Sequence, residues 1–237
     1  MNPAFKRILL KLSGEALAGG NGFGIDPATS AQVASEIAHV SRSGIQTAIV
    51  IGGGNFLRGA TTDGVSRVAG DTMGMLATLI NCIGFAQYLE KNGVAAKVLS
   101  AIEAQKAAEC YTPRLANQYL SEGKVLLLAG GTGNPFFTTD TAAALRCAEI
   151  GADVILKATK VDGIYDSDPM KNPDAARFDK ISHAEALSRN LKVMDATAFS
   201  FCMEQKIPII IFKLLEKGNL KRCIEGETVG SIIETGG

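Results

Sequence analysis

A glycine-rich stretch near the middle of the chain constrains the fold more than any other feature. An apolar run, 125–128, leads into the sequence Ala-Gly-Gly-Thr-Gly-Asn-Pro-Phe-Phe-Thr-Thr-Asp at 129–140, and an alanine-rich helical pattern, 141–150, follows. This order predicts a buried strand, a loop and a helix. Helix N-termini attract anions, and glycines let a backbone approach a ligand closely. The stretch therefore predicts an anion site, with Thr138 and Thr139 as helix caps or hydroxyl donors.

Asp140 ends this stretch, and its carboxylate is unexpected beside an anion site. It would repel a phosphate unless it bound a metal, oriented a lysine or handled a proton. It could equally complement the positive end of the helix dipole. Both interpretations stay open from this stretch alone.

Composition limits the class of protein. The 237 residues suffice for one large α/β domain or two tightly joined lobes. Lys+Arg and Asp+Glu both number 24, which argues against nucleic acid or an anionic membrane as an electrostatic partner. We expect no signal peptide and no membrane span. The five cysteines are widely spaced, without a zinc pattern, so we expect reduced thiols, no resident metal and a cytoplasmic protein.

Cationic residues follow several predicted strands. Lys11 lies near the end of the apolar run 7–12, Arg58 follows the glycine loop 52–54, and Lys157 ends another apolar run. Ligands of parallel α/β sheets bind at the carboxyl ends of the strands, and a buried lysine is costly unless it meets an anion. These residues favour a phosphate site, although a lysine that snorkels into solvent remains the alternative.

Strands alternate with helices along the whole chain, so we predict an α/β fold with a mostly parallel central sheet covered by helices on both faces. The expected strands are 7–12, 46–51, 96–99, 125–128, 153–156, 207–212 and 228–233. The expected helices are 27–43, 72–91, 113–121, 141–150, 183–190 and 196–205.

The helix expected over 72–91 is unusual because apolar residues surround most of it. This breadth indicates burial on two sides, in the core or at a subunit interface, and we favour the core. Asp71 precedes this helix and could cap it or face a sugar hydroxyl.

A segment of turn residues, acids and one aromatic follows Lys157. Tyr165 could stack on a base or cover the core, and Asp166 and Asp168 could face a ribose or a metal, or build the turn before Pro169. Together with the lysines and the glycine loops, this pattern favours phosphoryl transfer, which needs positioning and charge neutralisation. The chain has no P-loop motif, no dinucleotide fingerprint and no histidine near a nucleophile motif.

Five motifs, in this order along nearly the whole chain, resemble those of the bacterial uridylate kinases, a group within the amino acid kinase family. They are Lys-Leu-Ser-Gly-Glu at 11–15, Gly-Gly-Gly-Asn at 52–55, Gly-Asp at 70–71 with Met-Gly-Met-Leu-Ala at 73–77, the segment 132–140, and Lys-Ala-Thr-Lys-Val-Asp-Gly at 157–163. The resemblance implies a three-layer sandwich as a single domain over 1–237. Its N-terminal lobe, about 1–130, would lie largely on the UMP side, and its C-terminal lobe, about 131–237, on the ATP side.

The resemblance also implies transfer of the γ-phosphoryl group of Mg-ATP to UMP, giving UDP and ADP in pyrimidine nucleotide biosynthesis. The implied catalytic residues are Lys11, Asp140 and Lys157. The implied ATP-binding residues are Lys11, Leu12, Ser13, Gly14, Gly54, Arg58, Thr159, Tyr165 and Asp168. The implied UMP-binding residues are Gly53, Asp71, Thr132, Gly133, Asn134, Pro135, Phe136, Phe137, Thr138 and Thr139. No general base is implied, because a UMP phosphate oxygen already carries charge.

Assembly and regulation are further implications of the resemblance. Members of the group form homohexamers, and many are activated by GTP and inhibited by UTP. The segment linked to the GTP response corresponds to Gly19, Gly20, Asn21, Gly22, Phe23 and Gly24. The segment 60–64 is shorter than in some members, which leaves the effector response of this chain open.

Two alternatives stay open. One is another phosphotransferase of the same family, acting on a carboxylate or a carbamate, whose acceptor loop would lack the Pro-Phe-Phe-Thr-Thr run. The other is a non-catalytic nucleotide-binding or oxyanion-binding protein on the same fold. The joint presence of five charged residues argues against the second: Lys11, Arg58, Asp71, Asp140 and Asp168.

Overall fold

The computed structural model describes residues 3–57, 64–167, 171–172, 174–191 and 193–235. A nine-stranded sheet forms its centre, in the order β4-β3-β5-β2-β1-β6-β10-β11-β9. The strands are β1 (Arg7–Leu12), β2 (Gln46–Ile51), β3 (Ala96–Ser100), β4 (Glu109–Cys110), β5 (Val125–Ala129), β6 (Val154–Thr159), β9 (Lys180–Ser182), β10 (Ile209–Lys213) and β11 (Ser231–Glu234). Strands β7 (Ile164–Tyr165) and β8 (Arg177–Phe178) form a separate antiparallel pair.

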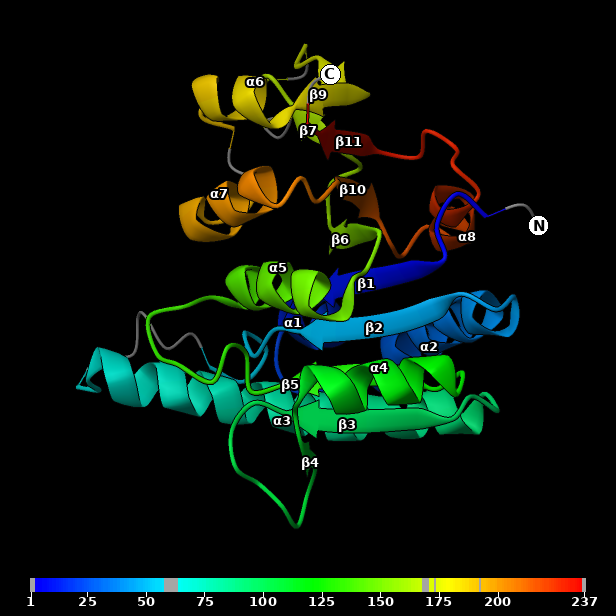
Figure 1. Cartoon of the computed structure of the whole chain (residues 1–237). Coiled ribbons are helices and arrows are strands. Elements are labelled where there is room, and N and C mark those ends of the chain that lie inside the picture. The colour runs from blue at the N-terminus through cyan, green and yellow to red at the C-terminus, as the bar shows by residue number, and fades with distance from the viewer. Residues whose placement is uncertain (1–2, 58–63, 168–170, 173, 192, 236–237) are drawn as a thin grey trace.

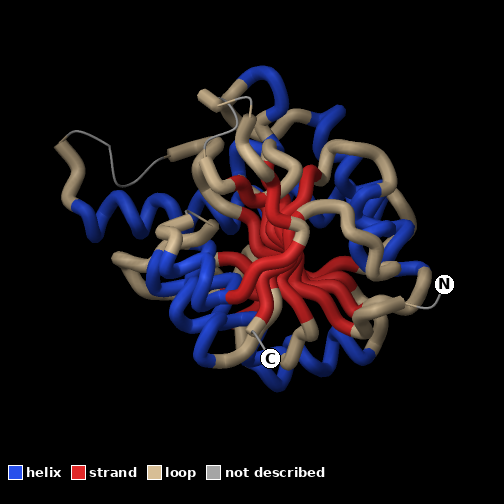
Figure 2. The backbone as a smooth tube through the Cα atoms, turned by 90° about the horizontal axis from the view of Figure 1, so that it is seen from above, coloured by secondary structure: helices blue, strands red, loops and turns tan. Residues whose placement is uncertain are grey.

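Helices cover both sides of the sheet, as the view from above shows (Figure 2). They are α1 (Gly14–Leu17), the 3₁₀ turn η1 (Gly19–Asn21), α2 (Pro27–Arg42), α3 (Arg67–Lys91), α4 (Pro113–Ser121), α5 (Thr139–Ile150), α6 (His183–Ser188), α7 (Ala196–Glu204) and α8 (Asn219–Ile224). Within the sheet every neighbouring pair is parallel except β10 and β11. The predicted α/β fold with a mostly parallel, covered sheet is confirmed.

Strand β1 lies at the middle of the sheet, between β2 and β6 (Figure 1). Its side chains alternate between the two faces. Ile8, Leu10 and Leu12 pack into a core with α2, α3 and α8, whereas Leu9 packs into a second core with α4, α5, α6 and α7. The alternation places Lys11 on the face of Leu9, toward α5.

The start of α3 differs from the sequence prediction. The helix begins at Arg67, and the Ser66 hydroxyl caps it by accepting a hydrogen bond from the Ala69 amide. Asp71, for which capping was one of two predicted roles, therefore lies in the second turn of the helix. The prediction took Gly70 as the end of a loop. A glycine inside a helix costs only about 1 kcal/mol, so the helix can continue through it.

Burial along α3 also differs from the prediction. Leu79, Cys82 and Phe85 are buried, but Leu76 is 47% exposed and Ile80 is 51% exposed. By length and composition α3 could cross a membrane. It instead contacts α2, β2, β3 and β5, so it is a core helix. Our preference for burial in the core on both sides of α3 was wrong for its outer stripe.

Several short elements were not predicted. Strands β4 and β9, at the two edges of the sheet, have two and three residues, and the β7–β8 pair has two in each strand. Helices α1 and α8, of four and six residues, were missed as well. Strand β6 continues to Thr159, so Lys157 lies inside this strand and not at its end. Elements this short show no periodicity, because they span less than two turns or two alternations.

Candidate active site

Two lysines lie side by side at the centre of the sheet. Lys11 of β1 and Lys157 of β6 are register partners in adjacent parallel strands. The first turn of α5 places the Asp140 carboxylate between them: Oδ1 lies 2.6 Å from the Nζ atom of Lys11, and Oδ2 lies 2.6 Å from that of Lys157. The side chains of Lys11, Lys157 and Asp140 are only 10%, 13% and 13% exposed. We call these three residues the lysine–aspartate cluster.

The cluster carries two positive charges and one negative charge. Burial alone would raise the pKa of the Asp140 carboxyl, but the ammonium groups of Lys11 and Lys157 outweigh it and hold this pKa below its usual value. Burial lowers the pKa of Lys157, the charge of Lys11 lowers it further, and Asp140 opposes both. Lys157 also donates a hydrogen bond to the Val193 carbonyl, at 2.5 Å. The cluster thus has a net positive charge and little exposure to solvent. Weak solvent screening strengthens its attraction for an anion.

A second carboxylate, Asp195, fixes the start of α5. It accepts hydrogen bonds from the Thr138 hydroxyl at 2.5 Å and the Thr141 hydroxyl at 3.1 Å. It also caps α7 by accepting from the Ala198 amide. Sequence analysis missed Asp195 as a site residue, although an aspartate just before a helical pattern is the usual signal of a cap.

The turns after β1 and β2 touch each other. A Cβ atom added to Gly14 would lie 2.5 Å from the Gly52 carbonyl oxygen and 2.4 Å from Oδ1 of Asn55. Only glycine fits at position 14, because real Cβ contacts are longer. Ser13 accepts a hydrogen bond from the Ala16 amide and caps the short helix α1. The structure thus brings the predicted residues Leu12, Ser13, Gly14 and Gly54 together beside Lys11.

A buried amide pair supports the loop after β2 and was not predicted. Asn55 and Asn81 exchange side-chain hydrogen bonds of 2.9 and 2.7 Å. Asn81, from α3, also donates to the Gly52 carbonyl at 2.8 Å. Asn55 donates to the Gly24 carbonyl at 2.7 Å. These bonds satisfy amide groups that would be costly to bury alone.

The 19–24 segment, expected to respond to effectors, lies against this same loop. Besides the bond from Asn55, the Gly24 amide donates to the Asn55 carbonyl at 3.0 Å. Phe23 and Phe56 make an edge-to-face contact with ring centroids 5.6 Å apart. The segment is thus joined to the glycine loop after β2.

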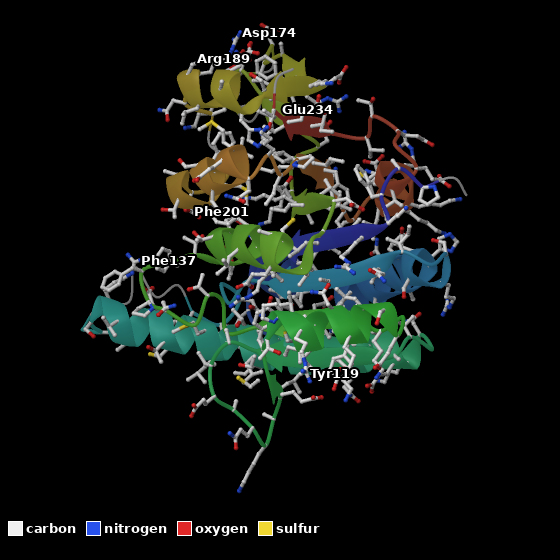
Figure 3. The ribbon with its side chains drawn as sticks, viewed as in Figure 1. Tyr119, Phe137, Asp174, Arg189, Phe201 and Glu234 are labelled. Carbon is white, nitrogen blue, oxygen red and sulfur yellow. The ribbon has the colours of Figure 1, made fainter. Side chains whose placement is uncertain are left out.

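The acceptor loop, 130–138, passes over the N-terminal half of α3 (Figure 1), and Figure 3 shows Phe137 at this end of the molecule. Asp71 of α3 accepts a hydrogen bond from the Phe136 amide at 2.8 Å and one from Nε of Arg67 at 2.7 Å. Burial would raise the pKa of Asp71, but these two bonds keep it below its usual value. The Asp71 carboxylate therefore holds this part of the loop against α3.

A small cavity opens between the acceptor loop and α3. Seven of the residues predicted to bind UMP line it: Gly53, Asp71, Thr132, Asn134, Phe137, Thr138 and Thr139. Four residues that were not predicted line it too: Gly74, Met75, Thr78 and Gly131. The other three predicted residues, Gly133, Pro135 and Phe136, belong to the same loop without lining the cavity. We call this space the acceptor cavity, after the role that the sequence predicts for the residues lining it.

A larger cleft of about 500 Å³ lies on the other side of the cluster, beyond the end of β6. Thr159, Tyr165 and Val193 help to line it. The Tyr165 hydroxyl donates to Asp162 at 2.7 Å, which raises the pKa of Tyr165 and lowers that of Asp162. Arg58 and Asp168, also predicted to bind ATP, lie outside the described residues.

Comparison with known proteins identifies the family. Residues 6–213 match the amino acid kinase family. The chain belongs to the amino acid kinase family. Solved structures of three kinases resemble this family member. A UMP kinase from Bacillus anthracis is 34% identical, with a TM-score of 0.95 over 98% of this chain and 97% of that one. A UMP kinase from Ureaplasma parvum is 35% identical, with a TM-score of 0.91 over 97% and 99%. A uridylate kinase from Archaeoglobus fulgidus is 26% identical, with a TM-score of 0.74 over 95% and 99%.

We expect the stability contribution of this family member's Asp140 to depend on pH. Its folded pKa lies below the ordinary value of 3.8, so the stabilisation is complete above that value and is lost as pH falls through the folded pKa. The advantage of wild type over Asp140→Asn in the free energy of unfolding should therefore stay constant near neutral pH and shrink as pH falls below about 4. Denaturant unfolding at a series of pH values measures it. An advantage that stays constant over the whole range would contradict the low pKa.

Proposed function

We propose that the protein is a UMP kinase, which transfers the γ-phosphoryl group of Mg-ATP to UMP and forms UDP and ADP in pyrimidine nucleotide biosynthesis. The observation that carries this proposal is the position of the lysine–aspartate cluster between two binding spaces. On one side, Thr139, adjacent to Asp140, lines the acceptor cavity. On the other side, Val193, the hydrogen-bond partner of Lys157, lines the larger cleft. Two structures at 34% and 35% identity over nearly the full length, both of UMP kinases, support the choice of acceptor.

Phosphoryl transfer depends on positioning of the two substrates and on charge neutralisation more than on covalent catalysis. Lys11 and Lys157 neutralise the charge that shifts between the two nucleotides during transfer. The N-terminus of α5, capped by Thr138, directs its positive dipole end toward the same place. Asp140 holds both lysines in position, and its charge opposes the lowering of the Lys157 pKa by burial. No general base is needed, because a UMP phosphate oxygen is itself the nucleophile.

Magnesium enters this proposal as part of Mg-ATP. Among the described residues, no group of three or more His, Cys, Asp and Glu side chains could hold a metal ion. Mg²⁺ is commonly held by substrate phosphates and waters with one or two carboxylates, so the residues present fit an ion carried by ATP. When bound, the ion would neutralise phosphate charge and orient the β- and γ-phosphates.

The remaining assignments extend the same proposal. Residues 11–14, Gly54 and Arg58 hold the ATP phosphates, and Thr159, Tyr165 and Asp168 hold the base and ribose. Most of the N-terminal lobe, about 1–130, serves UMP, and most of the C-terminal lobe, about 131–237, serves ATP. The residues proposed to bind UMP are Gly53, Asp71, Thr132, Gly133, Asn134, Pro135, Phe136, Phe137, Thr138 and Thr139. The protein acts in the cytoplasm.

Self-association is part of the proposal, as a homohexamer that GTP activates and UTP inhibits. The outer stripe of α3 supports it, because four apolar residues at helical spacing are exposed there: Met73, Leu76, Ile80 and Ile83. A second copy of the chain could bury this stripe. The 19–24 segment is the proposed route of the GTP response, and its bonds to Asn55 link it to the glycine loop after β2.

Acceptor choice tests the proposed function first. We expect ADP formation from Mg-ATP with UMP, and far slower formation with CMP, AMP, GMP or dTMP at equal concentration. A coupled assay of ADP release measures each rate. Turnover with another acceptor instead of UMP would replace the proposed substrate. UMP binding without any turnover would favour a binding protein.

The two sides of the site should respond differently to substitution. Lys11→Met should lower kcat by roughly 10²–10³-fold with little change in the KM for UMP, because the lysine neutralises charge at the transferred group. Asp71→Asn should instead raise the KM for UMP about tenfold or more, because it weakens the hold on the acceptor loop. Steady-state kinetics with each substrate varied separates the two patterns. Equal effects of Asp71→Asn on both KM values would remove its acceptor role.

The proposed homohexamer predicts the molar mass of the protein in solution. Wild type should run as a hexamer in light scattering, and Ile80→Asp should shift it to a smaller species, because a charge in a buried apolar contact is costly. Leu187→Asp, at an exposed position of α6, is the matched control and should keep the wild-type mass. A wild-type monomer would refute self-association without touching the proposed reaction.

A further inference from the structure

A buried arginine lies beneath the acceptor loop. Arg146, on α5, is only 5% exposed, yet it carries a permanent charge. Its Nη2 donates to the Gly131 carbonyl at 3.3 Å, and its Nη1 donates to Oε2 of Glu149 at 2.5 Å. Burying a guanidinium destabilises the folded protein unless its charge is paired and its N–H groups donate hydrogen bonds.

Glu149 and Tyr111 hold this guanidinium in place. The Tyr111 hydroxyl donates to the same Oε2 atom of Glu149 at 2.7 Å. The Cζ atom of Arg146 lies 4.1 Å from the centroid of the Tyr111 ring, a stacked cation–π contact. Arg146 is therefore neutralised by one carboxylate and covered by one ring, so its direction toward Gly131 is fixed.

The carbonyl that Arg146 contacts belongs to the central peptide of a tight turn. The Gly133 amide donates to the Gly130 carbonyl at 2.9 Å, which closes a turn over 130–133. Gly131 has φ +60°, and Thr132 is not among the residues with positive φ. This sign pattern is that of a type II′ turn, in which glycine is favoured at the first central position. A flipped Gly131–Thr132 peptide would convert the turn to type I′, which needs φ > 0 at Thr132 as well as at Gly131. Positive φ is unfavourable for a β-branched residue, so Thr132 and the bond from Arg146 favour the same orientation of this peptide.

We propose that Arg146 is a positioning residue for the acceptor: its bond to the Gly131 carbonyl holds the Gly131–Thr132 peptide in one orientation, and that orientation presents the Thr132 amide to the nucleotide. The N–H and C=O of a trans peptide point in opposite directions, so the carbonyl held by Arg146 turns the Thr132 N–H away from α5. Gly131 and Thr132 both line the acceptor cavity. This inference rests on the proposed UMP kinase function for the identity of the acceptor.

Arg146→Lys keeps the charge but loses the fork that contacts Glu149 and Gly131 together. We expect its KM for UMP to rise about tenfold, with the KM for ATP and kcat within about twofold of wild type. Tyr111→Phe removes one hydroxyl that orients Glu149 and should shift the KM for UMP in the same direction by less. If Arg146→Lys folds poorly, Tyr111→Phe replaces it as the test variant.

Arg7→Lys is the matched control. Arg7 also donates to a backbone carbonyl of α5, that of Ile150, but at the opposite end of the helix from the acceptor cavity. This variant should keep the wild-type KM for UMP, whatever its effect on the melting temperature. Equal shifts in both KM values, or a shift that Arg7→Lys reproduces, would overturn the positioning role and leave only a structural one.

A crystal structure of Arg146→Lys separates this inference from the proposed function. A flipped or mixed Gly131–Thr132 peptide supports the inference even if wild type fails to phosphorylate UMP, an outcome that would refute only the reaction. An unchanged peptide orientation together with a wild-type KM for UMP overturns the inference while the UMP kinase function stands.

Discussion

The two ion pairs of Asp140 are the interaction on which the rest of the site depends. Lys11 and Lys157 occupy adjacent register positions in the middle of the sheet, so their ammonium groups would repel each other without a carboxylate between them. That carboxylate must come from the first turn of α5, which fixes where the helix begins. Asp195 then ties the same turn to α7 through Thr138. The fold thus assembles a net positive charge and supplies the backbone amides of a helix N-terminus at one point.

A parallel sheet makes this convergence possible. The carboxyl ends of β1, β2, β5 and β6 share one edge, so the segments that follow them meet there, although 11–14 and 157–159 are far apart in sequence. β1 has β2 on one side and β6 on the other, so the loops that follow these two strands lie over opposite halves of the sheet. The acceptor cavity forms on the β2 and β5 side, and the larger cleft forms on the β6 side.

Sequence patterns predicted the elements whose own residues determine them. Helix α2, with Asp26 as its cap and Pro27 in its first turn, and strands β1 and β2 lie within one residue of their predicted bounds. Other features were hidden because they arise from tertiary contacts. Asn81 is an unremarkable helix residue until it meets Asn55 and Gly52, and Arg146 could equally have been a solvent-exposed arginine. The spacing of residues in a sequence predicts which face of a helix or strand is buried. It does not predict the hydrogen-bond partner of a buried polar group, because that partner comes from a distant segment of the chain.

The backbone of the binding loops is held mainly by side chains of two helices. From α3, Asn81 donates to the Gly52 carbonyl, Thr78 accepts from the Gly130 amide, and Asp71 accepts from the Phe136 amide. From α5, Arg146 donates to the Gly131 carbonyl. Loops rich in glycine lose much conformational entropy when they are ordered, and these bonds from rigid elements offset that loss before a nucleotide arrives. Because α3 also carries the exposed apolar stripe, a partner that held this helix in place would hold both loops with it.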